Sequence, residues 1–71
     1  MTPHLKHPMW QHELTLPDGT TLVCWLDRQL SKGQVVTLKE IPRVRWTVWT
    51  AYSEASEKDA LHKPWRVGGI A

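Results

Sequence analysis

The chain has 71 residues, a formal net charge of +2, one cysteine, and five tryptophans without any phenylalanine. A chain of this length forms one domain that buries about 60% of the surface of its unfolded form, so at least one indole is expected at the surface. The single cysteine excludes an internal disulfide and favours a reducing compartment, and we expect a cytoplasmic protein without a signal peptide or membrane anchor. The small positive charge permits attraction to polyanions without requiring it.

The first part of the chain divides into a leading segment and a hairpin. Residues 1–9 are polar and contain two prolines, so we expect a flexible N-terminal segment before a single small β-rich domain at 10–71. Alternation of polar and apolar residues predicts strands at Trp10–Leu16 and Thr20–Asp27. The intervening Pro17-Asp18-Gly19 is typical of a tight turn, because proline presets one φ angle and glycine supplies a positive one.

The second part of the chain predicts further short strands. The pattern predicts a third strand at Gln34–Glu40 and a fourth at Val44–Tyr52. Residues 53–62 place acids early and bases late, which favours one short helical turn that Pro64 ends. A last short strand is expected at 65–67. The fold class is therefore mostly all-β: a small SH3-like barrel or a curled antiparallel sheet of four to five strands, with one helical turn.

Two resemblances accompany this pattern. The segment Leu30-Ser31-Lys32-Gly33-Gln34-Val35-Val36-Thr37-Leu38 resembles the loop-and-strand opening of KOW-type and other SH3-like barrels, and it implies a barrel. A second group of segments is similar to short uncharacterised phage and actinobacterial proteins: Asp18-Gly19-Thr20, Cys24-Trp25-Leu26-Asp27, Lys-Gly-x-x-Val-Thr-Leu-Lys, Trp46-Thr47-Val48 and a closing His-x-x-Trp-x-x-x-x-Ile. The second resemblance implies no activity; it implies a host protein or a virion component as the partner.

The fourth predicted strand has two chemically distinct sides, because side chains alternate across a strand. One side is apolar and is expected to face the core: Val44, Trp46, Val48 and Tyr52. The other side is basic and aromatic: Arg43, Arg45, Thr47 and Trp49. We expect Trp25 and Lys39 on neighbouring strands to extend this second side into a partner-binding surface.

The basic and aromatic surface fits more than one role. Tryptophan and arginine are enriched at protein-binding hot spots, so we expect a non-enzymatic binding or adaptor module that contacts a protein or a second copy of itself. Alternatively, the indoles stack on bases and the arginines contact phosphates, which would make a small nucleic-acid-binding protein. A structural subunit of a homo-oligomer is a further alternative, and so is a solvated face on which Arg45 covers Trp49.

Candidates for metal binding and catalysis are weak in this sequence. His4, His7 and His12 have the spacing H-x2-H-x4-H, but two of them lie in the segment expected to be flexible, so we expect no metal site. Cys24 lies between Leu22 and Leu26 on the apolar side of its strand, which predicts a small buried hydrophobe rather than a nucleophile. No catalytic residue, cofactor or small-molecule substrate is expected.

Overall fold

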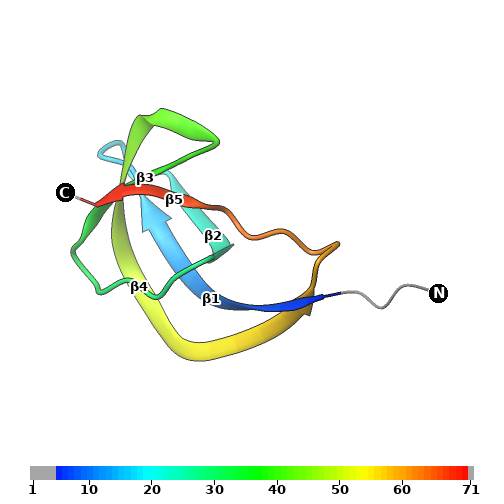
Figure 1. Cartoon of the computed structure of the whole chain (residues 1–71). Coiled ribbons are helices and arrows are strands. Elements are labelled where there is room, and N and C mark those ends of the chain that lie inside the picture. The colour runs from blue at the N-terminus through cyan, green and yellow to red at the C-terminus, as the bar shows by residue number, and fades with distance from the viewer. Residues whose placement is uncertain (1–4, 71) are drawn as a thin grey trace.

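The computed structural model describes residues 5–70, without the side chain of Ser53. These residues form one antiparallel sheet and no helix, and Figure 1 shows the sheet curling around its own inner face. The strands are β1 (Lys6–Thr15), β2 (Thr21–Leu26), β3 (Val35–Leu38), β4 (Ile41–Asp59) and β5 (Val67–Ile70). The predicted all-β fold is confirmed, in the form of a curled antiparallel sheet. The described part of the chain holds no helix that could cross a membrane.

The strands follow the order β2-β1-β4-β3-β5, so β2 and β5 are the two edges. The edges meet at one parallel bridge between Leu26 and Trp65. There Trp65 N donates to Trp25 O at 2.9 Å, and Asp27 N donates to Trp65 O at 3.2 Å. The sheet is therefore curled until its edges touch at a single point, and no continuous ladder closes it.

The β1–β2 hairpin agrees with its sequence prediction. Gly19 has a φ of 91°, which a glycine adopts without strain. Leu16 N donates to Thr20 O at 2.8 Å, and Thr20 N donates to the Asp18 carboxylate at 2.9 Å. This second bond lowers the pKa of Asp18. The turn sets the register that pairs Leu14 with Leu22 across the two strands.

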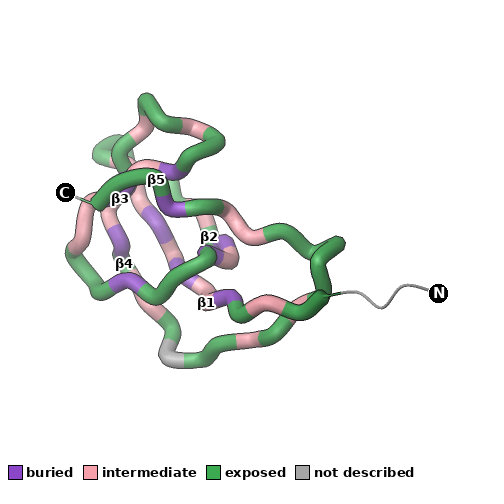
Figure 2. The backbone as a smooth tube through the Cα atoms, viewed as in Figure 1, coloured by how far each residue is buried: buried purple, intermediate pink, exposed green. Residues whose placement is uncertain are grey.

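The core fills the inner face of the curl. In Figure 2 most buried positions lie on the strands, and the long connections are mostly exposed, with Leu30 in the loop after β2 as a buried exception. Leu14, Leu26 and Leu38 are fully buried, and Cys24 is buried beside them as predicted. The other members of this cluster come from every remaining element: Leu30, Val36, Trp46, Val48 and Val67. One cluster therefore joins all five strands and the loop after β2.

The predicted helical turn near 53–62 is wrong. Strand β4 continues to Asp59 and pairs with the first half of β1, from Lys6↔Asp59 to Trp10↔Ala55. Only the end of the segment turns, where His62 N donates to Asp59 O at 3.0 Å. A ten-residue polar segment is a marginal helix by itself, so pairing with a distant strand decides its conformation.

Strand β1 also begins earlier than predicted. Residues 1–4 of the expected flexible segment lie outside the described residues, whereas Lys6–Met9 belong to β1. Met9 has no exposed surface. These residues are ordered because the extension of β4 gives them a ladder partner, which Figure 1 shows as a two-stranded arm reaching toward the N-terminus.

Two irregularities bend β4. The register passes from Glu13↔Thr50 to Leu14↔Val48, which leaves Trp49 as an extra residue. A second shift lies opposite Trp10–His12. Such bulges bend a strand and change the face on which side chains stand. Consequently Tyr52, predicted to face the core, is 37% exposed.

Candidate binding surface

Among the large hydrophobic side chains on the described strands, Trp49 is the most exposed, with 55% of its surface accessible. The Lys32 ammonium lies 5.0 Å from the centre of its ring, within the range of a cation–π contact. The loop that carries Lys32 is fixed to β4, because Gly33 N donates to Val48 O and Val48 N donates to Gln34 O, each at 2.8 Å. Trp49 is thus held in place yet open to solvent.

Arg45 lies further along β4 and borders a shallow groove. Both Arg43 and Arg45 are exposed, as the sequence predicted. The groove has a volume of about 270 Å³ and is lined by Val35, Val36, Thr37, Arg45, Gly69 and Ile70. Register places Arg45 opposite Thr37, and Thr37 opposite Gly69 on the next strand. The groove therefore runs across β4, β3 and β5, and Gly69 leaves its far end open.

Trp49 and the groove lie on one face of the sheet. Thr47 stands between Trp49 and Arg45 and pairs with Val35. This outer surface is called the Trp49 face below, and its members are Lys32, Val35, Thr37, Arg45, Thr47, Trp49 and Gly69. Within residues 5–70 the only ion pair joins Arg66 to Glu40, so Lys32 and Arg45 have no carboxylate partner there. The face therefore combines an exposed indole with uncompensated positive charge.

Contrary to the sequence prediction, Trp25 is not on a strand next to that of Trp49. It stands on β2, and β1 separates β2 from β4. The Lys58 ammonium lies 5.3 Å from the centre of its ring, so this contact spans β1. Gln11 is opposite Trp25 and His7 is opposite Lys58, which places Met9 between them on the same face. Trp25 is half-buried, and Met9 has no exposed surface, so we infer that Trp25 covers Met9 and has a structural role.

Lys39 lies at the tip of the β3–β4 hairpin, away from Trp49. Its backbone N donates to Arg66 O at 2.8 Å. A Cβ atom at Gly68 would lie 3.3 Å from Lys39 Cγ, so the side chain runs close along β5. Lys39 adds positive charge beside β5 rather than beside the indole.

Lys32 is the surface residue that sequence reasoning missed. One alternative placed Arg45 over Trp49, whereas the structure puts Lys32 over the ring. The signal was present as Lys32-Gly33 directly before a strand, since Gly33 has a φ of 93° and turns the chain back toward β4. What the sequence could not supply is the pairing of that loop with Val48.

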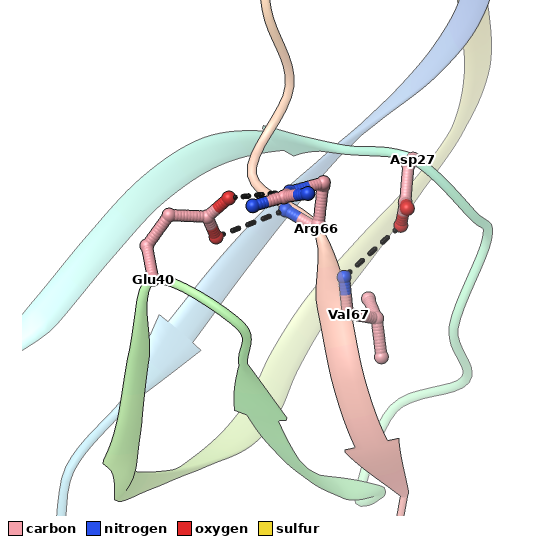
Figure 3. A network of polar contacts seen from close by, with 4 residues as sticks. All are labelled: Asp27, Glu40, Arg66 and Val67. Carbon is pink, nitrogen blue, oxygen red and sulfur yellow. Dashed lines mark hydrogen bonds and ion pairs between the residues drawn. The ribbon is translucent and has the colours of Figure 1, made fainter.

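A hollow of about 540 Å³, larger than the groove beside Arg45, lies at the seam of the two edges. Three of the four charged residues that line it, Asp27, Glu40 and Arg66, bind other groups of the protein, as Figure 3 shows; the fourth is Lys63. Arg66 Nε donates to Glu40 Oε1 at 2.8 Å, which lowers the pKa of Glu40. Arg66 N donates to the same carboxylate at 3.3 Å, and Val67 N donates to Asp27 Oδ1 at 3.1 Å. These contacts hold β5 against β2 and the hairpin tip, so the seam is a structural joint.

A buried histidine and cysteine face each other inside the curl, yet they do not form a catalytic pair. His12 is fully buried and stands opposite Cys24. Leu30 N donates to His12 Nε2 at 2.9 Å, so His12 Nδ1 carries the proton and donates to Trp10 O at 2.9 Å. Both ring nitrogens are therefore used. Burial raises the pKa of Cys24 to about 11, which keeps it a neutral thiol.

The histidines that the structure describes are not gathered into a metal site. His4 lies outside the described residues, and His12 uses both nitrogens in backbone bonds. Among residues 5–70, no group of three or more histidine, cysteine, aspartate or glutamate side chains could hold a metal ion.

Comparisons of this chain with protein-family models, with curated proteins and with solved structures find no match. We therefore infer its function from the chemistry of the Trp49 face.

Proposed function

We propose that this chain is a non-enzymatic binding module that contacts a protein partner through the Trp49 face. The observation that carries the proposal is the exposed Trp49, which stands on the outer face of the sheet with the Lys32 ammonium over its ring. Tryptophan and arginine dominate the free energy of protein interfaces because they offer large contact areas and directed hydrogen bonds. The buried thiol of Cys24 agrees with a reducing compartment such as the cytoplasm.

A selection experiment tests the proposal. Random peptides displayed on phage are selected against the immobilised full chain, and the selected peptides are titrated against wild type, Trp49→Thr and Val23→Thr. Val23 is the matched control, since it is 53% exposed on β2 and lies outside the Trp49 face. We expect Trp49→Thr to weaken binding by about tenfold or more and Val23→Thr by less than about twofold. Equal losses, or the recovery of no binding peptide, would contradict the proposal.

Nucleic acid is the second candidate, because exposed cations flank the indole on the same face. Base stacking on an aromatic ring contributes about 1–3 kcal/mol per base and tolerates most sequences. Titration of tryptophan fluorescence with single-stranded and duplex oligonucleotides separates the two candidates. Saturable quenching that weakens steeply toward about 0.2 M salt would assign the face to nucleic acid. Light scattering of wild type and Trp49→Thr tests the remaining alternative, because a mass that falls on substitution would indicate self-assembly.

A further inference from the structure

The groove beside Arg45 opens at an unpaired sheet edge. Strand β5 ends the strand order, so within residues 5–70 one of its sides has no ladder partner. Gly68 and Gly69 are exposed, and β5 contains no lysine or proline of the kind that protects edges from pairing. An extended segment can therefore add to this side by backbone hydrogen bonds, as peptides do at other exposed edges.

The groove connects the β5 edge with the charged side chain of Arg45. Arg45, Thr37 and Gly69 lie in one line across the sheet. An added strand would lie three strand spacings from β4, about 14 Å. Gly69 has no side chain to block this line, and Thr37 is small. A long side chain that enters over Gly69 therefore meets the guanidinium of Arg45 inside the groove.

The size and charge of the groove select its occupant. Its volume of about 270 Å³ is below the range of about 300–1,000 Å³ that is usual for small-molecule pockets, so it fits one side chain rather than a whole ligand. Among residues 5–70, Arg45 is the one charged residue that lines it, and Lys39 runs along the neighbouring Gly68. The one acid near the hairpin tip, Glu40, is already paired with Arg66. A carboxylate side chain fits this environment best, and glutamate reaches further than aspartate.

We propose that β5 is the docking edge for an extended acidic peptide, which adds as a sixth strand and places a glutamate in the groove against Arg45. This inference rests on the proposed protein-binding function and names the chemistry of the partner. Backbone hydrogen bonds to β5 supply affinity, and the pairing of glutamate with Arg45 supplies specificity.

The test uses a capped peptide of alternating threonine and valine with one central glutamate, together with its glutamine, aspartate and lysine versions. Each is titrated against the full chain by NMR. We expect the glutamine peptide to bind about tenfold more weakly, and Arg45→Gln to cause the same loss. In Arg45→Gln the glutamate and glutamine peptides should bind equally, because the two changes remove one interaction. Arg43→Gln is the matched control and should cost less than about threefold, since Arg43 does not line the groove.

Two further readouts locate the peptide. Amide hydrogen exchange should slow at Gly68–Ile70 when the glutamate peptide is bound. Gly69→Ala should weaken binding while the protein stays folded, because its new Cβ would lie 3.3 Å from Thr37 Oγ1 and narrow the groove. Absence of binding at millimolar peptide, binding without coupling to Arg45, or unchanged exchange at β5 would each overturn the inference. If selected peptides depend on Trp49 but leave β5 unaffected, the edge inference fails and the proposed function stands.

Discussion

Trp25 and Trp49 look alike in chemistry and differ in what lies beneath them. Each has a lysine ammonium about 5 Å from its ring centre: Lys58 at 5.3 Å and Lys32 at 5.0 Å. Trp25 is half-buried over Met9, which has no exposed surface and lies outside the main core cluster. Trp49 stands on a bulge and is 55% exposed. A cation–π contact therefore does not identify a binding residue; the surface left open around the ring does.

The largest expected effect is at Met9. Met9→Ala should lower the free energy of unfolding by about 3 kcal/mol, because it removes a fully buried side chain and leaves a cavity under Trp25. That is a large share of the stability of a domain of this size. Urea unfolding followed by tryptophan fluorescence measures the loss. Leu61→Ala is the control, since Leu61 is 74% exposed and its loss should stay within about 0.5 kcal/mol. Similar losses in both variants would show that Met9 is not a buried residue that stabilises the fold.

The contrast between the two tryptophans also separates what the sequence predicts from what it does not. The hairpin at Pro17-Asp18-Gly19 and the in–out alternation of residues 44–49 are local properties, and both are confirmed. The strand order is not local. Placing β1 between Trp25 and β4 depends on contacts between segments distant in the chain, so the expected placement of Trp25 on the strand next to Trp49 was wrong.

The helical turn was wrong for the same physical reason. The polar segment 53–62 has charges in a helical order, but its backbone pairs with Lys6–Trp10 at the opposite end of the chain. Ladder hydrogen bonds along this arm outweigh a weak local preference. The bulge at Trp49, after which the alternation no longer places Tyr52 in the core, likewise depends on the register with β1 and has no signature in the residues themselves.

A smaller effect is expected at His12, on the inner face of the same sheet. Burial lowers the pKa of His12 below its ordinary value of 6.5, and protonation would place a second N–H against the Leu30 N–H that Nε2 now accepts. The folded state therefore binds this proton less readily than the unfolded state does. The contribution of neutral His12 to the free energy of unfolding is therefore complete above pH 6.5. It is lost as the pH falls below 6.5, with a slope of at most about 1.4 kcal/mol per pH unit.

Urea unfolding between about pH 7.5 and about pH 5 checks this dependence. The carboxylates Asp18 and Glu40 also have lowered pKa values. They change the free energy of unfolding only near and below their ordinary pKa values of 3.8 and 4.5, which lie outside this pH window. His62→Gln is the control, because His62 is exposed and its variant should keep the pH dependence of the wild type. Stability that stays constant or rises on acidification would contradict the bonding assigned to His12.

The smallest effect on stability is expected at Trp49. Substitution of Trp49 therefore tests most directly whether the two tryptophans differ in role. Trp49→Thr keeps a residue suited to a strand and removes only an exposed ring with its contact to Lys32, a contact of about 0.5–1 kcal/mol. The free energy of unfolding should fall by no more than about 1 kcal/mol, whereas Trp25→Thr should cost about 2 kcal/mol because it uncovers Met9. If both variants lose the same amount, Trp49 is a structural residue and the Trp49 face loses its central element. If stability is unchanged and peptide binding is lost, the ring is kept on the surface for contact with a partner.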